Sequence, residues 1–289
     1  MNLVLGFAVG YSPEVMAPFV ESIRSAGQFA GEVALFIDPA IPGATEYLKT
    51  RQIKPIPFEG AKLSNANIGL ARCFSYLSYM REHWREGKVF QQILLTDVRD
   101  VVFQRALFGT PCDELEFHLE EPYPSIGACP YNALWIQQAF GDAVLERVAD
   151  KNISCSGTVT GRASGIVNYL TQMTYLAERL PEHLRQVQGI DQGLHNYILY
   201  GGLPQSLTVK KNFERVATLG YAKGDEIRCD AAGCIVNPDG TISELAHQWD
   251  RHVGLSTTLH AIAHRRRLLS EVSFLVQDEM PDASQTLSG

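Results

Sequence analysis

The segment Ile93-Leu94-Leu95-Thr96-Asp97-Val98-Arg99-Asp100-Val101-Val102-Phe103 is the most informative part of this chain. Its three consecutive aliphatic residues predict a strand that is buried on both faces, as in the middle of a parallel sheet. The strand leads directly into Asp97, Arg99 and Asp100, and charged groups at the end of a buried strand are costly unless they are paired. Ligands of open α/β sheets bind outside the carboxyl ends of the strands. Two carboxylates there suit a hard divalent cation that also contacts a substrate phosphate, so the segment predicts a metal–phosphate site.

The composition excludes several classes of protein. Of the 289 residues, 45% are hydrophobic and 20% are charged, as in ordinary soluble globular proteins, and the length allows one large domain or two small ones. A formal net charge of −7 argues against nucleic acid as the main partner. There is no apolar run for a membrane span, no positive region of a secretory signal, and no CxxC pair among the six cysteines. These features predict a cytoplasmic protein, and no pattern indicates an oligomeric state.

The order of the expected elements predicts an α/β fold. The first part of the chain alternates strands at 3–9, 33–37 and 53–58 with helices that begin after Ser12 and near Ala44. Such βαβαβ alternation is typical of a parallel sheet covered by helices. No GxGxxG follows the first strand, so a dinucleotide fingerprint is absent. Further helices are expected from a cap at Ser64 or Asn65 to about Trp84, over 132–148, over 164–180, and from Gly189 to Gly201.

Several polar residues have two interpretations at this stage. Arg72 lies among apolar helix positions and either pairs within the core or reaches a phosphate or carboxylate of the central site. The acidic run 114–121 is expected to be a solvated surface segment without function. Residues 154–164 are small and hydroxylated, and they either admit a ligand close to the backbone or form a tight turn into the next helix. Asp191 and Gln192 fall in the first turn of a helix, where the dipole favours an acid in any case.

The late part of the chain contains a dense polar cluster and then an amphipathic helix. The turn at 237–240 predicts a hairpin that delivers the cluster 247–252, in which His247 is either a structural histidine or a ligand. Three arginines at 265–267 interrupt an apolar stripe, which predicts a helix that packs on the domain or, alternatively, contacts a membrane surface through residues 259–275. We therefore expect a main domain at 1–258, followed by this helix and a disordered tail at 259–289.

Taken together, these features resemble the nucleotide-sugar glycosyltransferases of the GT-A fold, in particular the retaining, metal-dependent group that includes glycogenin and bacterial galactosyltransferases. The resemblance depends on the order and spacing of short motifs from Gly6 to His252. These motifs are a first strand ending near Val9 and Tyr11, a helical Arg72, Asp97-Val98-Arg99-Asp100, Cys155-Ser156-Gly157 in place of Asn-Ser-Gly, Asp191-Gln192, and His247. The fold that the resemblance implies is Rossmann-like, with a mixed, mostly parallel central sheet flanked by helices.

The resemblance also implies a role for each motif. Asp97, Asp100 and His247 would bind a divalent cation, and an imidazole ligand favours Mn²⁺ over Mg²⁺. Asp191 and Gln192 would stabilise the reacting sugar. The donor would be a nucleoside-diphosphate sugar, UDP- or GDP-linked, and the acceptor a hydroxyl of a saccharide or another molecule, with retention of configuration. The residues that would contact the donor are Val9, Tyr11, Arg72, Asp97, Val98, Arg99, Ser156 and Gly157.

The metal motif departs from the family pattern. The family spaces its two acids at i and i+2, whereas this chain has them at i and i+3. In an extended strand three residues span about 10 Å and point to opposite faces, so such carboxylates do not share one ion. Either the chain bends after Thr96, or the acids divide the work, with Asp100 on the metal and Asp97 on the ribose or a metal-bound water. We favour the division. Arg99 would either contact the diphosphate or neutralise Asp97.

Two other functions stay open. A sugar-phosphate nucleotidyltransferase shares the sheet and a metal-binding acid, but Gly10-Tyr11-Ser12-Pro13 lacks the basic residues of its glycine-rich loop. A non-catalytic nucleotide- or carbohydrate-binding protein would keep the glycosyltransferase shell. The altered metal motif favours this alternative, whereas the presence of both Asp100 and His247 argues against it.

Overall fold

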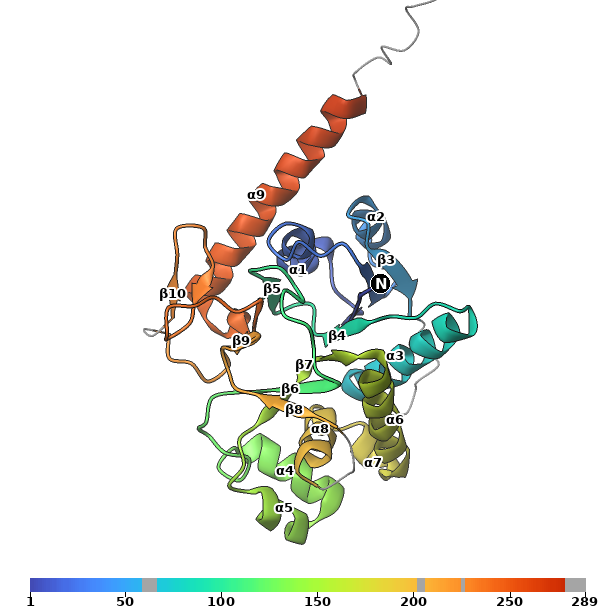
Figure 1. Ribbon diagram of the computed structural model, residues 1–289, viewed down its shortest axis with the longest axis vertical. Coiled ribbons are helices and arrows are strands. Elements are labelled where there is room, and N and C mark those ends of the chain that lie inside the picture. Colours follow the sequence, from blue (N-terminus) through green and yellow to red (C-terminus); the bar gives the residue numbers. More distant parts are fainter. Residues whose placement is uncertain (59–66, 202–205, 225–226, 279–289) are drawn as a thin grey trace, which may run out of the picture.

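A computed structural model describes residues 1–58, 67–201, 206–224 and 227–278, with the side chains of 269–278 left out. Its centre is a seven-stranded sheet of the order β3-β2-β1-β4-β7-β6-β8 (Figure 1). The strands are β1 Leu3–Ala8, β2 Glu32–Ile37, β3 Lys54–Pro57, β4 Gln92–Thr96, β6 Leu115–Leu119, β7 Ser154–Arg162 and β8 Thr208–Lys210. Every neighbouring pair is parallel except the two that β7 makes with β4 and β6. The predicted α/β class and mixed, mostly parallel sheet are confirmed.

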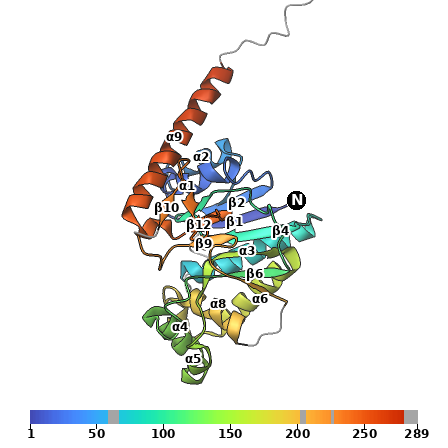
Figure 2. The same cartoon turned by 60° about the vertical axis from the view of Figure 1, so that its left-hand side comes forward.

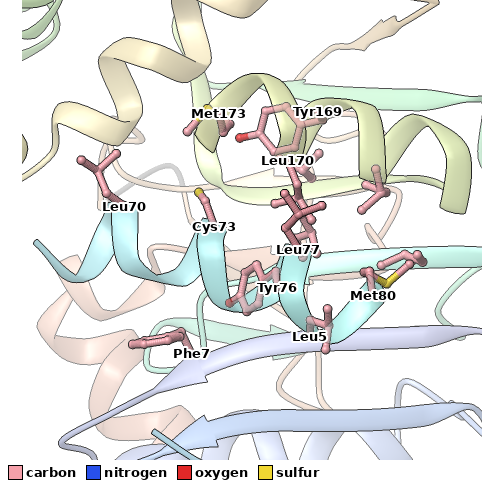
Figure 3. Packing of buried hydrophobic residues seen from close by; sticks show 14 of the residues in the cluster. Leu5, Phe7, Leu70, Cys73, Tyr76, Leu77, Met80, Tyr169, Leu170 and Met173 are labelled. Carbon is pink, nitrogen blue, oxygen red and sulfur yellow. The ribbon is translucent and has the colours of Figure 1, made fainter. Parts of the chain in front are cut away.

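Helices cover both faces of this sheet because its central strands are apolar on both sides. One face carries Val4 and Leu94 and packs against α1 and α2, and the other carries Leu5 and Leu95 and packs against α3, α6 and α8. Figure 3 shows α3 lying between β1 and α6, with its apolar side chains directed to both. The helices are α1 Pro13–Arg24, α2 Ala44–Thr50, α3 Ile68–Arg85, α4 Pro130–Phe140, α5 Asp142–Val148, α6 Ala163–Arg179, α7 Glu182–Arg185, α8 Ile190–Tyr200 and α9 Val253–Asp278.

A second, smaller sheet joins the two polar segments of the sequence. Immediately after the acidic motif the chain forms β5 Val101–Phe103, which leaves the main sheet and pairs in the order β5-β12-β9 with β12 Leu245–His247 and β9 Val216–Thr218. β12 runs antiparallel to β5, with His247 opposite Val101. The late histidine is thereby placed next to the acidic motif, although the two are far apart in the chain.

The acidic run was predicted wrongly, and the tight turn offered as one interpretation of the small-residue segment is also wrong. Residues 115–119 form β6 inside the main sheet, and Glu116 and His118 are fully buried. The charge of Glu116 is compensated by Arg215, whose Nε lies 3.0 Å from its Oε2. Residues 154–162 form the long strand β7, not a tight turn. Strand β7 is held between β4 and β6 by hydrogen bonds to both.

Three local predictions also need correction. The turn at 237–240 is present, but it does not form the predicted hairpin, since β11 Ile235–Val236 pairs with β10 Arg228–Cys229 and β12 pairs elsewhere. The helix expected over 132–148 is divided at Gly141 into α4 and α5. The caps expected at Ser64 or Asn65 lie outside the described residues, and α3 is capped by Asn67, whose Oδ1 accepts a hydrogen bond of 3.0 Å from the Leu70 N–H.

The C-terminal helix begins earlier than expected and projects from the body of the molecule. Figure 2 shows α9 projecting from the rest of the molecule. The helix starts at Val253, inside the predicted main domain, and its first turns pack Leu255 and Leu259 against Trp249 of the short helix η2 Trp249–Arg251. Farther along, Arg267 lies 3.1 Å from Glu14 of α1. A search of the described ranges for a helix with the length and apolarity of a bilayer span finds none. Contact of 259–275 with a membrane surface stays a prediction, and the tail 279–289 lies outside the described residues.

His195 of α8 is expected to make the fold sensitive to acid. Its buried ring stacks on Phe117 at 4.1 Å, and its nitrogens lie 2.9 Å from Ser154 Oγ and from the Tyr169 hydroxyl. Burial, aided by neighbouring positive charge, lowers the pKa of His195 to about 3. The unfolded chain takes up this proton near pH 6.5, so the free energy of unfolding should fall by up to about 1.4 kcal/mol per pH unit as the pH drops through this window.

Denaturant unfolding between about pH 7 and pH 4.5 measures this slope. In His195→Gln the free energy of unfolding is expected to fall less steeply with decreasing pH than in the wild type, while the variant remains folded at neutral pH. Exposed His183 of α7 offers the matched control, because His183→Gln should keep the wild-type slope. Equal slopes for the His195 variant and the wild type would contradict the prediction.

Candidate metal centre and cleft

The acidic motif bends at the end of β4, and the bend brings its two acids together. The regular strand ends at Thr96, and the Asp97 N–H donates a hydrogen bond of 2.7 Å to the Gly157 carbonyl of β7. Asp97 and Asp100 are therefore not held apart by an extended strand, as the sequence analysis had assumed. The geometric reason for giving them separate roles no longer holds. A carboxylate oxygen each from Asp97 and Asp100 and a ring nitrogen of His247 lie within 4.8 Å of one another.

These three side chains fit a divalent cation. His247 is 1% exposed, and neither of its ring nitrogens makes a hydrogen bond within the described residues. Its Nε2 lies 3.4 Å from Asp97 Oδ2 and 3.7 Å from Asp100 Oδ2. A buried ring nitrogen that makes no well-formed hydrogen bond is unfavourable, and a cation shared with the carboxylates would give it a ligand bond in its place. Two oxygens and one imidazole nitrogen suit Mn²⁺ best, with Mg²⁺ as the harder alternative.

The charges around the group agree with this assignment. Burial acts to raise the pKa of Asp97, but Arg72 and His247 outweigh it and bring the pKa to about 2. For Asp100, burial dominates and, with Asp97 nearby, raises the pKa even though His247 opposes it. Burial acts to lower the pKa of His247, whereas Cys155 and Asp100 raise it well above its usual value. The carboxylates are thus crowded in a place that attracts positive charge.

Arg72 of α3 forms ion pairs with Asp97 of the metal group and with Asp191 of α8. Its side chain is 12% exposed, and its Nη1 donates to Asp97. Its Nη2 lies 2.8 Å from Asp191 Oδ2 and 3.1 Å from Ser156 Oγ. Arg72 therefore reaches carboxylates of the central site. It neutralises Asp97, a role that the sequence analysis had considered for Arg99.

Three of the residues predicted to contact the donor lie in other surroundings than expected, namely Arg99, Val98 and Val9. Arg99 is 56% exposed and pairs with Asp250, its Nη2 lying 3.1 Å from Asp250 Oδ2, so it does not neutralise Asp97. Arg99 and Tyr11 both line the cleft described below. The side chains of Val98 and Val9 instead pack against the apolar core. Neither valine lines the cleft, although Val9 is only partly buried.

Asp191 and Gln192 are held by β7 at the start of α8. The Gln192 Oε1 accepts a hydrogen bond of 2.8 Å from the Ser156 N–H, and its Nε2 donates one of 2.6 Å to the Ser154 carbonyl. The Asp191 Oδ2 accepts a hydrogen bond of 3.2 Å from Ser156 Oγ, in addition to that from Arg72. Gln192 thus positions the strand, whereas Asp191 carries the charge at this part of the cleft.

One cleft of about 850 Å³ collects these groups. All of the site residues predicted from the sequence line it, except Val9, Val98 and the buried His247. Sequence reasoning missed a further part of its wall, which is formed by Glu120, Tyr131, Asn132, Trp135, Tyr221 and Arg251. Glu120 was hidden in the acidic run. Tyr131 and Trp135 lie four residues apart on one helical face, and this spacing was the signal that could have indicated an aromatic surface.

Gly157 leaves the space in which the metal group forms. A Cβ at this position would lie 2.4 Å from Asp97 Oδ2 and 2.6 Å from His247 Cε1. Gly157→Ala is therefore expected to displace these side chains and to weaken Mn²⁺ binding, measured by titration calorimetry, by about tenfold or more, which corresponds to about 1.4 kcal/mol. Gly254→Ala is the control, since a Cβ there meets no atom within 4 Å. Wild-type Mn²⁺ affinity in Gly157→Ala would show that the group does not hold the ion.

Comparison with known proteins does not place the chain in a family. No protein-family model matches it, and no curated protein sequence matches it. The function of the cleft is therefore inferred from its own side chains and their geometry.

Proposed function

We propose that the protein is a metal-dependent glycosyltransferase of the GT-A type, which transfers a sugar from a nucleoside-diphosphate sugar to an acceptor hydroxyl. The observation that carries this proposal is the group formed by Asp97, Asp100 and His247, whose ligand atoms lie within 4.8 Å of one another. The group lies at the carboxyl end of β4, and ligands of α/β sheets bind at such ends. The parallel order β3-β2-β1-β4 followed by antiparallel β7 is compatible with the GT-A arrangement.

The cleft offers the groups that such a transfer needs. A divalent cation held by Asp97, Asp100 and His247, Mn²⁺ by preference, would act as a Lewis acid toward the donor diphosphate, UDP or GDP in the first instance. Arg99 is exposed at the cleft wall, where its guanidinium can donate to phosphate oxygens. Tyr11, Ser156 and Gly157 complete the surface against which the donor would lie.

The transfer itself exchanges one bond at the anomeric carbon. The acceptor oxygen forms a bond to that carbon, while the bond from the carbon to the phosphate oxygen breaks and its electron pair leaves with the diphosphate. The acceptor hydroxyl releases its proton to the departing diphosphate. The carbon is electron-poor in between, and we assign the Asp191 carboxylate to stabilise it. Arg72 and Gln192 hold Asp191 and β7 in place for this role, and retention of configuration is part of the proposal.

A thermal-shift titration tests the proposal directly. The protein is heated with UDP, GDP, dTDP and CDP, each with and without Mn²⁺, and the matching sugar nucleotides are then assayed for transfer. A ligand at a hundredfold excess over its Kd adds about 2.7 kcal/mol to the free energy of unfolding. Stabilisation by one diphosphate only when metal is present, with sugar transfer from the matching donor, would support the proposal. Metal-dependent binding without transfer or donor hydrolysis would indicate a non-catalytic binding protein. No metal-dependent response would overturn the transferase proposal and favour the non-catalytic alternative.

A further inference from the structure

Two aromatic side chains line the cleft without a role in the donor site. Tyr131 and Trp135 lie one turn apart on α4, with ring centroids 6.1 Å apart and planes inclined by 32°. Both rings line the cleft, and Tyr131 is 67% exposed. Large exposed aromatic rings inside a concave site are typical of a surface that binds a ligand.

Trp135 is fixed against the beginning of α8, beside Asp191. A Cβ at Gly193 would lie 2.9 Å from Trp135 Cβ, and a Cβ at Gly189 would lie 2.1 Å from its Cζ2. The two glycines thus allow the indole to lie directly on the helix start. The aromatic pair is therefore a rigid surface next to the carboxylate that we assign to the reacting sugar. Rigid positioning of this kind lowers the entropic cost of ordering a substrate.

Two buried polar side chains on the same wall have oxygens that can accept hydrogen bonds from a ligand. Glu120 is 6% exposed and Asn132 is 5% exposed, and both line the cleft. Among the described residues the Asn132 Oδ1 has no hydrogen-bond partner, whereas the Glu120 carboxylate accepts a hydrogen bond from the Cys155 thiol and has further lone pairs to offer. Tyr221 joins these groups, because its hydroxyl lies 3.2 Å from the Cys129 Sγ to which Asn132 donates. An amide oxygen buried without a donor, beside a carboxylate with spare acceptor capacity, favours a ligand rich in hydroxyl groups.

We propose that this wall is the acceptor site of the transferase and that the acceptor is a saccharide, whose sugar ring stacks on Tyr131 and Trp135 while its hydroxyls donate to Glu120 and Asn132. The inference rests on the proposed function. The C–H groups on one face of a pyranose carry weak positive charge, and the face of an aromatic ring is negative, so the two attract each other.

Saccharide binding can be measured without any transfer. Ligand-observed NMR with the methyl glycosides of glucose, galactose, mannose and N-acetylglucosamine, and with lactose and maltose, is run on the full chain alone and with the diphosphate that binds plus diamagnetic Mg²⁺ in place of Mn²⁺. Octanol and a serine-rich peptide represent the other classes of hydroxyl acceptor. At least one saccharide should bind the wild type, and its Kd should rise tenfold or more in Tyr131→Ala and in Glu120→Gln. Tyr175→Ala is the matched control, because Tyr175 is 51% exposed on α6 and lines a different groove.

The metal-dependent diphosphate response of the same variants separates the possible outcomes. Lost saccharide binding with an unchanged diphosphate response supports the inference. Loss of the diphosphate response in Tyr131→Ala would assign the rings to the nucleotide base and overturn it. Binding of octanol or the peptide but of no saccharide would overturn the inference and leave the transferase proposal standing. Saccharide binding without any diphosphate response would instead overturn the transferase proposal, and the assignment of this wall as an acceptor site would fall with it.

Discussion

Replacing Asp100 with asparagine is expected to abolish the stabilisation that Mn²⁺ and a nucleoside diphosphate give together. Asp100 is 8% exposed, and it offers one of the three ligand atoms of the group with Asp97 and His247. An amide oxygen carries no full charge, so the ion would lose one of two anionic ligands. A hundredfold loss of affinity removes about 2.7 kcal/mol of ligand-dependent stabilisation, and thermal shift measures this loss. Without metal, the variant should be no less stable than the wild type, because a buried carboxylate is itself costly.

The matched control is Asp113→Asn, which changes an aspartate that is 51% exposed and pairs with Lys210. This variant is expected to keep the full response. Asp97→Asn distinguishes the two roles considered for Asp97. If Asp97 is a metal ligand, its affinity for Mn²⁺ alone falls, and if it holds the ribose, only the affinity for the diphosphate falls. A wild-type response in Asp100→Asn would show that the group does not bind metal.

The parts of the fold that follow from local pattern were predictable. Leu3–Ala8 and Ile93–Leu95 are aliphatic runs without alternation, and such runs become buried strands wherever both faces are covered. Strand β6 was missed for a non-local reason. Its Glu116 is buried only because Arg215 and Thr160 supply hydrogen bonds of 3.0 and 2.7 Å from distant parts of the chain. No window of sequence around 114–121 contains these partners.

The candidate site shows the same division between local and non-local information. The two carboxylates at 97 and 100 were enough to predict a metal site from residue type and position, whereas His247 was named as a third ligand only through the resemblance to the glycosyltransferases. Their mutual geometry was not predictable, since the bend after Thr96 depends on the hydrogen bond from Asp97 to Gly157 on β7. The partners of Arg72 and Arg99 were left open in the sequence for the same reason, because a guanidinium pairs with whichever carboxylate the tertiary fold places beside it.

Replacing Arg72 with leucine is expected to lower the free energy of unfolding by roughly 3 kcal/mol, because removing one partner of a buried ion pair leaves uncompensated charge. Arg72 is 12% exposed and pairs with both Asp97 and Asp191, the second at 2.8 Å. The value lies at the lower end of the usual range since Asp97 is 35% exposed and can be partly solvated. Denaturant unfolding without metal measures the loss. Arg179→Leu is the control, because this exposed arginine lies over the Tyr175 ring at 3.8 Å and should change stability by less than about 0.5 kcal/mol.

Two further variants separate charge from geometry at Arg72. Arg72→Lys keeps the charge but not the planar fork that reaches two carboxylates, so it should restore only part of the lost stability. Arg72→Leu combined with Asp191→Asn removes an unpaired charge along with its partner, and it should be more stable than Arg72→Leu alone. If Arg72→Leu unfolds like the wild type, the two acids do not depend on this guanidinium. Asp191 would then need another source of compensation to stay ionised, and the carboxylate assigned to the reacting sugar would be the first role to revise.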